Sequence, residues 1–326
     1  MARGIGEFGP IQDLIPEWAA IVVALVTQLG DVWFLTLLVG GLYLYRTDDR
    51  EEAAVVVGLL LTGFATIITL KYAFALPRPE QPFVRLESLP AIVRPLYESI
   101  GTADGYGFPS GHAFMTTVIY VALARRLSIG TARQRLLGAA TVIVAVCLSR
   151  VALGVHYLVD VAAGAAGGLL LVLATEWLLD RYAADRATAA FALAILASAS
   201  AVLVASDDPD AVLLLGASLG AFGGWQLVRL SEGFPERERE REQERKRDRA
   251  RDHRSHSRSR SRIDRRLALR IGLAVGAFAP LAVALVYFGL VSMPVPAASG
   301  ALGFGLAAIL AVPVLHTVRS RRASGI

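Results

Sequence analysis

The sequence predicts an all-α protein, a polytopic helical membrane bundle of about nine spans with a six-helix core and C-terminal helical additions. Composition is the first reason: 55% of the 326 residues are hydrophobic, 19% are charged, and the mean hydropathy is +0.52. This balance is typical of multi-pass membrane proteins and argues against an ordinary soluble domain. The second reason is that apolar residues gather into runs about long enough to cross a hydrocarbon layer of ~30 Å as helices.

The first apolar run covers residues 18–45 and is interrupted at Gly30-Asp31. It predicts either one broken span or an interfacial helix followed by a short span. Further runs lie at about 52–75, 108–124, 136–154, 157–179, 187–205, 211–230, 267–291 and 298–318. Small residues inside them, as at Gly164-Ala165-Ala166-Gly167-Gly168, favour close approach between helices in lipid.

These runs divide the chain into five parts. We expect an N-terminal interfacial segment at 1–17, a membrane core at 18–206 and an additional span at 207–230. An arginine-rich, disordered cytoplasmic linker is expected at 231–264, and a C-terminal hairpin of two spans at 265–326. Residues 231–266 hold 14 Lys or Arg and 9 Asp or Glu, an excess of five that equals the net charge of the whole chain.

The linker is low in complexity because Glu alternates with Arg, and Arg with Ser. An Arg-Ser tract can bind RNA, and basic clusters beside a span can hold anionic lipid. No aromatic residue lies among these charges, and acidic residues offset many of them. We therefore expect a solvated linker and no nucleic-acid partner. The sequence does not identify a protein partner, and membrane lipids are the expected surroundings.

Arginines in the short loops predict the orientation of the chain. They follow the third, fifth, seventh and last of the nine predicted spans, so all four groups fall on one side. By the positive-inside rule this side is cytoplasmic, in a protein of the cell membrane. The loop at about 76–107 and the turn Ser149–His156 then face outward.

An arginine, a histidine and an aspartate lie close together in the stretch Ser149–Asp160, between two apolar runs. If the residues from His156 onward are helical, Asp160 lies one turn away on the same face and can orient the imidazole. Arg150 offers a planar fork of donors to phosphoryl or carboxylate oxygens. Ionisable residues beside membrane spans usually serve a function, although these three could simply fix two helices together.

A second cluster lies where the run at 52–75 ends. Lys71 is near its last residue, and Arg78 follows among prolines that end the helix. The two cations can converge on one anion from the helix end and from the loop. A lysine at this position can also serve only to reach the membrane surface.

The third cluster, Pro109-Ser110-Gly111-His112, marks a helix start. Free backbone N–H groups and the helix dipole favour an anion there, and Gly111 lets a phosphoryl oxygen approach the backbone. His112 is placed to protonate a leaving group, although alone it could equally make a structural hydrogen bond. All three clusters are predicted on the same face of the membrane.

The order and spacing of these residues resemble the signature of the phosphatidic acid phosphatase type 2 superfamily, which includes vanadium-dependent haloperoxidases. The three parts of the signature are Lys71…Arg78-Pro79, Pro109-Ser110-Gly111-His112 and Ser149-Arg150…His156…Asp160. The resemblance covers about residues 50–180 and could extend to the span before and the one after, so the membrane core at 18–206 would be the phosphatase core of the membrane lipid phosphatase branch. It covers neither the linker nor the last hairpin.

The resemblance implies a role for each residue. His156 would be the nucleophile that forms a phosphohistidine, Asp160 would orient it, and His112 would protonate the leaving group and later activate water. The residues that would hold the phosphoryl oxygens are Lys71, Arg78, Ser110, Gly111 and Arg150. The family works without a metal, so we expect neither metal nor cofactor, and the spacing of the histidines and Asp160 is not that of metal ligands.

We therefore expect an integral membrane phosphatase that hydrolyses a phosphomonoester or pyrophosphate lipid at the outer leaflet. Polyprenyl diphosphate, phosphatidic acid and phosphatidylglycerophosphate are candidate substrates. Phosphotransfer to a second alcohol would use the same residues and stays open. Vanadate-dependent halide oxidation shares the site but fits nine spans poorly. The non-enzymatic alternative is a membrane scaffold or flippase whose arginine-rich segment binds a partner.

Overall fold

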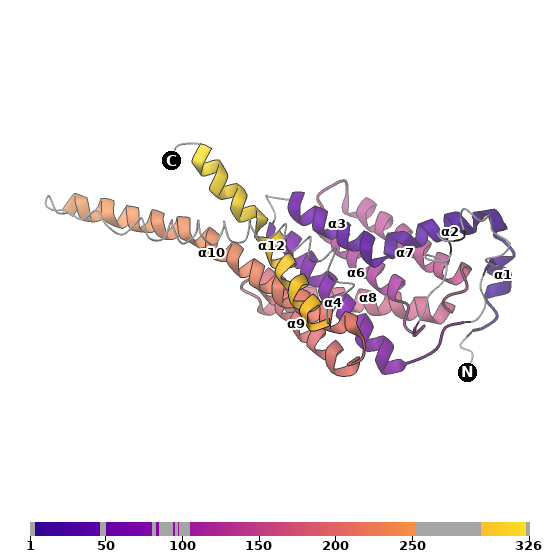
Figure 1. Ribbon diagram of the computed structural model, residues 1–326. Helices are drawn as coiled ribbons and strands as arrows, with labels where there is room; N and C mark the ends of the chain where they lie inside the picture. The colour runs from indigo at the N-terminus through magenta and orange to yellow at the C-terminus, as the bar shows by residue number, and fades with distance from the viewer. Residues whose placement is uncertain are drawn as a thin grey trace. The chain divides into compact units, whose positions relative to one another are not determined.

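The computed structural model describes residues 4–45, 50–79, 83–84, 94, 97, 105–251 and 295–323, and this part of the chain is all-helical (Figure 1). It divides into two compact units, Met1–Leu214 and Leu215–Ile326. The helices are α1 (Phe8–Gln12), α2 (Ala20–Thr27), α3 (Val32–Tyr45), α4 (Arg50–Phe74), α6 (Gly111–Arg126), α7 (Ala132–Ala152), α8 (Leu158–Tyr182), α9 (Arg186–Val204), α10 (Pro209–Arg251) and α12 (Val295–Ala323).

The predicted all-α membrane bundle is confirmed. Among the described residues, five helices are long and apolar enough to span a membrane: α4, α7, α8, α9 and the Pro209–Leu230 part of α10. A bent pair, Ala20–Gly30 with Val32–Leu44, would make a sixth. The predicted third span is the 16-residue helix α6, and the apolar part of α12 is Ala297–Val312. The expected span at 267–291 lies outside the described residues.

The interruption in the first apolar run is a sharp break. A short 3₁₀ turn at Gln28–Gly30 ends the first half, and the two halves meet at an angle of 47°. Gly30 packs so closely on α6 that a Cβ atom there would lie 2.3 Å from Thr116 Oγ1. The break therefore depends on a residue without a side chain, and it places Asp31 beside the start of α6.

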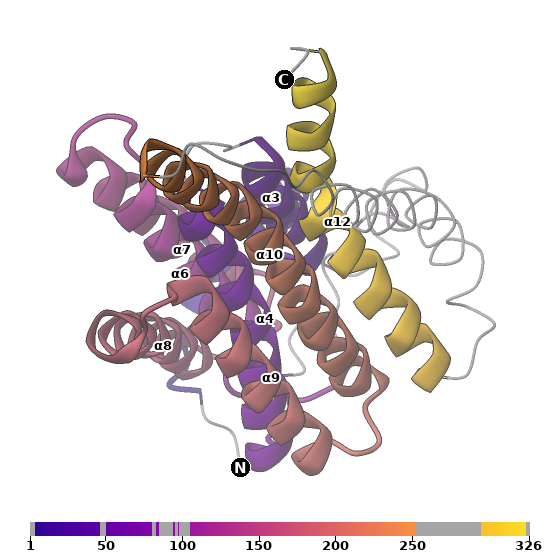
Figure 2. The ribbon, with the colours of Figure 1, turned by 90° about the vertical axis from the view of Figure 1, so that its left-hand side faces the viewer.

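The helix α4 forms the centre of the first unit. Nearly all of its first four turns are buried, because it packs against α9, α6 and α3 (Figure 2). The helix α6 packs in turn against α7 and α8. The N-terminal segment predicted to be interfacial contributes to this core, since Phe8 packs with Ala113, Val151 and Val161.

Two glycines bring α8 into contact with the backbone of α6, as the small-residue cluster predicts. A Cβ atom on Gly164 would lie 2.5 Å from the carbonyl oxygen of Ser110, and one on Gly168 would lie 2.4 Å from that of Phe114. These two contacts, one helical turn apart, set the separation of α6 and α8 at the end where Ser110 lies.

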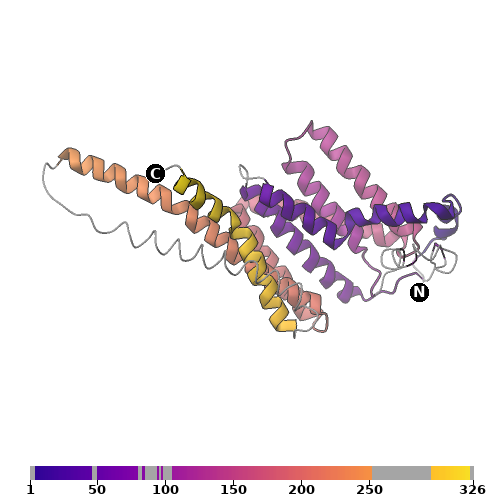
Figure 3. The same cartoon turned by 45° about the horizontal axis from the view of Figure 1, so that its top comes forward.

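The second unit holds the rest of α10 together with α12. The two helices lie side by side in Figure 3. Glycines allow this close approach, because a Cβ atom on Gly220 would overlap the carbonyl oxygen of Gly303. The helix α10 continues to Arg251, whereas the sequence predicted disorder from residue 231. Glutamates three or four residues before arginines or lysines, as in the tract 236–247, stabilise a helix and explain the difference. Residues 252–264 of the predicted linker lie outside the described residues.

Candidate active site

Every residue of the predicted signature lies at one end of the first unit. Lys71 is in the last turn of α4, and Arg78 follows where that helix has ended. Ser110 precedes α6, and Gly111 and His112 begin it. Arg150 is in the last turn of α7, His156 is in the turn that follows, and Asp160 is in the first turn of α8. Three segments far apart in sequence therefore converge.

His156 is at the centre of this cluster and is only 1% exposed. Its Nε2 atom lies 2.9 Å from Nη1 of Arg78, which also donates to the carbonyl oxygen of Val155 at 3.2 Å. A guanidinium has donors only, so Nε2 must accept with its lone pair. The proton of the neutral ring is then on Nδ1, which faces Asp160. This is the tautomer that a nucleophilic Nε2 requires.

Asp160 approaches the histidine in an arrangement that differs from the predicted one. The helix begins at Leu158, so His156 lies before it and not one turn back within it. Gly154, with φ of +71°, provides the left-handed residue that turns the chain between α7 and α8. Oδ2 of Asp160 accepts from the Tyr157 N–H at 3.0 Å and lies 3.6 Å from Nδ1 of His156.

The backbone of Asp160 connects the segment that holds His156 to the start of α6. Its carbonyl oxygen accepts a hydrogen bond of 2.9 Å from the N–H of Ser110, at the start of α6. Together with the glycine contacts of α8, this bond fixes the third part of the signature against the second. The relative positions of His156 and His112 therefore depend on one backbone contact and one helix interface.

Arg150 and Ser110 have buried polar atoms whose hydrogen bonds a bound anion would complete. Arg150 is 2% exposed and donates to Thr27 Oγ1 at 3.1 Å. Its Nε atom and the Oγ of Ser110 are buried without a hydrogen-bond partner among the described residues. Buried polar groups are normally paired, and the oxygens of a phosphoryl group would satisfy both.

The start of α6 faces the lysine that ends α4. A Cβ atom on Gly111 would lie 3.7 Å from Nζ of Lys71, so the ammonium group is beside the first N–H groups of α6. Gly107 brings the preceding segment close to the second cluster, because a Cβ there would lie 2.9 Å from the Pro77 carbonyl oxygen. The Lys71 ammonium group and the positive end of the α6 dipole therefore both favour an anion in the space between them.

Burial and the positive charges around His156 favour the neutral form of its ring. Burial lowers the pKa of the His156 imidazole well below its ordinary value, and the positive charges of Arg150, Arg78 and Lys71 lower the pKa further. A neutral ring keeps the lone pair with which it can attack phosphorus.

The sequence analysis missed Asp31, which approaches the second histidine. Oδ2 of Asp31 lies 3.5 Å from Nε2 of His112, and the two side chains are 30% and 24% exposed. The interruption of an apolar run by Gly30-Asp31 was the available signal, because it placed a carboxylate within a membrane-length segment. Its partner could not be read from the sequence, since the two residues are 81 positions apart.

Glu7 and Thr27 are two further residues that the sequence analysis missed. Glu7 accepts from the N–H of Leu158 at 3.0 Å and so satisfies a donor at the start of α8, next to the turn that holds His156. Thr27 holds the guanidinium of Arg150. Neither residue lies in a recognisable motif. Within the described residues, no group of three or more His, Cys, Asp or Glu side chains is arranged to hold a metal ion.

Comparisons with known proteins bear on the same region. The model of the PAP2 superfamily matches residues 51–183, which contain all three parts of the signature. No curated protein sequence matches the chain significantly. Among solved structures, the chain is similar to the first transmembrane PAP2 type phosphatidylglycerolphosphate phosphatase from Bacillus subtilis. The identity is 25% and the TM-score 0.41, over 53% of this chain and 83% of that one.

The match of the family model supports the resemblance that the signature predicted. It begins at the second residue of α4 and ends just after α8, so it covers the helices that carry the three clusters. The helices that precede and follow it include others long and apolar enough to span a membrane. The chain is therefore a multi-pass helical membrane protein, and its residues 51–183 match the model of the PAP2 superfamily.

Proposed function

We propose that this protein is a membrane phosphatase that hydrolyses a phosphomonoester or pyrophosphate lipid through a phosphohistidine on His156. The observation that carries the proposal is the environment of His156. Nε2 accepts from Arg78, Nδ1 faces Asp160 at 3.6 Å, and the ring is buried among cations. A buried imidazole in this tautomer is an activated nucleophile for a group that carries negative charge.

The phosphoryl group would lie between the start of α6 and the end of α7. The guanidinium groups of Arg78 and Arg150, the ammonium group of Lys71 and the first N–H groups of α6 would donate to its oxygens. Charge spreads over these oxygens in the transition state, so fixed donors lower the barrier. The unpaired Nε of Arg150 and Oγ of Ser110 support this placement.

Hydrolysis would take two steps. Nε2 of His156 forms a bond to phosphorus while the bond from phosphorus to the leaving oxygen breaks, and His112 gives that oxygen a proton. His112 then takes a proton from water, whose oxygen attacks phosphorus and releases phosphate from His156. Asp31 would act as a positioning residue that orients the ring of His112.

The site is proposed to face the outer side of the membrane. The exposed Arg125 and Arg133 lie around the loop between α6 and α7, at the opposite end of these helices from the signature residues. By the positive-inside rule this loop is cytoplasmic, which places the signature near the outer head groups. The lipid phosphate would then be cleaved without crossing the membrane.

Replacement of His156 by Ala tests the function. Phosphate release by the purified protein should be measured in detergent over a panel of phosphatidic acid, phosphatidylglycerophosphate and polyprenyl diphosphate. We expect the wild type to release phosphate from at least one of them and H156A to lose it by a factor of about 10³ or more. Undiminished release by H156A would refute the mechanism. Transfer of labelled phosphate to an added alcohol, in preference to water, would instead identify a phosphotransferase.

A further inference from the structure

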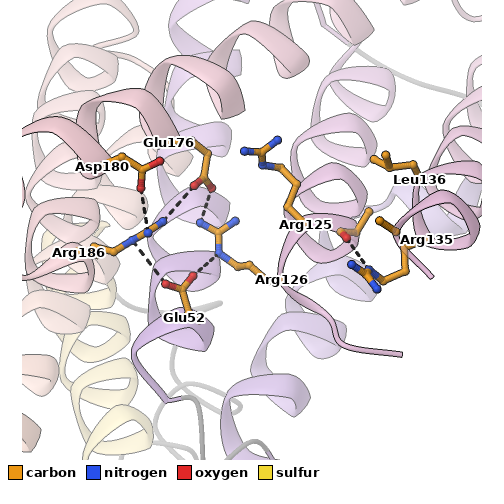
Figure 4. Close-up of a pocket in the computed structure, with 10 residues that line it drawn as sticks. Glu52, Arg125, Arg126, Arg135, Leu136, Glu176, Asp180 and Arg186 are labelled. Carbon is orange, nitrogen blue, oxygen red and sulfur yellow. Dashed lines mark hydrogen bonds and ion pairs between the residues drawn. The ribbon is translucent and has the colours of Figure 1, made fainter. Parts of the chain in front are cut away.

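A polar pocket of about 550 Å³ lies at the other end of the same helices (Figure 4). The starts of α4, α7 and α9 and the ends of α6 and α8 form its walls, whereas the signature residues lie at the opposite ends of α4, α6, α7 and α8. The lining residues are Glu52, Ala124, Arg125, Arg126, Ala132, Arg135, Leu136, Glu176, Asp180 and Arg186. The pocket is therefore separate from the candidate active site.

Two arginines of this pocket hold its three carboxylates. The Arg126 side chain is 6% exposed and pairs with Glu176 and, through Nε at 2.9 Å, with Glu52. Arg186 reaches Glu176 at 3.1 Å, Asp180 at 2.9 Å and Glu52 at 3.5 Å. This network connects α4, α6, α8 and α9. Its carboxylates are already engaged by cations, so they repel an incoming anion only weakly.

The two remaining arginines have no carboxylate partner in the part of the chain that the structure describes. Arg135 donates to the carbonyl oxygens of Ala124 at 2.8 Å and Gly130 at 2.9 Å, which fixes its side chain without neutralising its charge. Arg125 is exposed, and no dashed line reaches it in Figure 4. Ala132 begins α7, whose dipole adds positive potential at the same wall. The pocket therefore offers two uncompensated guanidinium groups beside a helix start.

Aromatic side chains mark the depth of this end of the bundle in the membrane. Trp177 and Tyr182, in the last turns of α8, are 61% and 69% exposed and contact each other edge to face. Exposed Trp and Tyr at the end of a span are typical of the level of the lipid head groups. Glu176 and Asp180, which line the pocket, belong to the same two turns of α8.

We propose that this pocket binds the phosphate group of an anionic phospholipid from the leaflet opposite the candidate active site. Arg125 and Arg135 donate to the phosphate oxygens, and the positive end of the α7 dipole adds to the potential there. Guanidinium groups bind phosphate through paired donors, and a pocket of this volume accommodates a head group. The bound lipid connects α6 to α7, next to the ion-pair network that connects α6 to α4, α8 and α9.

Native mass spectrometry of the full-length protein in detergent tests the proposal. The probes are phosphatidylglycerol, phosphatidylcholine and inorganic phosphate. We expect phosphatidylglycerol to remain bound to the wild type and its affinity to fall about 10-fold or more in Arg125→Gln/Arg135→Gln. The matched control is Arg133→Gln/Arg181→Gln, which removes two exposed arginines of the same helix ends outside the pocket and should keep wild-type affinity.

The single variant Arg125→Gln distinguishes loss of binding from a folding defect in the double variant, because Arg125 makes no contact that the fold requires among the described residues. It should keep the wild-type melting temperature and still lose part of the affinity for phosphatidylglycerol. Equal loss in the control double variant, or no loss in Arg125→Gln and Arg125→Gln/Arg135→Gln, would overturn the proposal. Arginine-dependent binding of inorganic phosphate without binding of phosphatidylglycerol would assign the pocket to free phosphate and overturn the lipid assignment.

Discussion

Replacement of Asp31 by Asn separates the two tasks that this carboxylate can perform. Asp31 precedes α3, and its Oδ1 lies 3.4 Å from the N–H of Trp33, so it caps that helix. Asn caps a helix about as well as Asp does. The substitution therefore leaves the break in the first span intact and removes only the negative charge beside His112.

The expected loss follows from the distance of 3.5 Å between Asp31 Oδ2 and His112 Nε2. Coulomb's law with an effective dielectric constant of ~20 gives about 5 kcal/mol for a full charge pair, which is an upper bound. A hydrogen bond to a charged group contributes about 1.5–3 kcal/mol, and Asn keeps an acceptor. We therefore expect kcat to fall about 10-fold, well below the 10²- to 10⁴-fold contribution of a general acid.

The assay compares two substrates that differ in their leaving group. An alkyl phosphomonoester lipid needs a proton on its leaving oxygen, whereas p-nitrophenyl phosphate does not. If Asp31 acts through His112, D31N slows the lipid substrate and leaves the aryl substrate nearly unchanged. The loss of activity in H112A is the largest loss that D31N can cause through His112, so adding D31N to H112A should cause no further loss. An equal loss on both substrates, or a full additional loss in the double variant, would refute the reasoning.

Three further predictions concern pH, packing and orientation. The pKa of His156 is well below its ordinary value of 6.5, so its ring is neutral at neutral pH. We therefore expect kcat/KM to fall only as the pH drops below about 6.5, and a midpoint of this fall above pH 7 would contradict the reasoning. Gly168→Ala should lower the melting temperature, with a cost of about 1–3 kcal/mol, because its Cβ would meet the α6 backbone, whereas Gly138→Ala, with nothing within 4 Å, should not. In a variant with Cys147 replaced by Ser, a cysteine at Ile129 should not react with a membrane-impermeant thiol reagent in intact cells, whereas a cysteine at Asp207 should react. The reverse pattern would place the candidate active site on the cytoplasmic side.

Much of the site was predictable because its chemistry is carried by short local patterns. His156 and Asp160 are four residues apart, and Ser110-Gly111 marks the start of a helix, so the residues within each cluster of the signature lie close together in the sequence. Helix periodicity and apolar length then predicted which end of each helix they occupy. Glycine clusters predicted the close approach of α6 and α8, since only residues without bulky side chains allow it.

Contacts between distant segments were not predictable in the same way. Asp31 and His112, Thr27 and Arg150, and Glu7 and Leu158 are pairs whose partners come from different helices. Each partner alone has an ordinary local role, as a cap, a hydroxyl within a helix or a polar residue near a terminus. The extension of α10 to Arg251 has a local cause instead. The high charge content of this segment predicts disorder, but the spacing of Glu before Arg stabilises a helix.

The sequence by itself determined that this protein is a helical membrane protein with a three-part signature at the ends of its helices, because apolar length and motif spacing are properties of the chain. Only the tertiary structure decided which atoms meet: Arg78 with Nε2 of His156, Asp31 with His112, and two unneutralised arginines around a second pocket. The physical reason is that charge and hydrogen bonding act over a few ångströms in space. That distance bears no fixed relation to separation along the chain once helices pack.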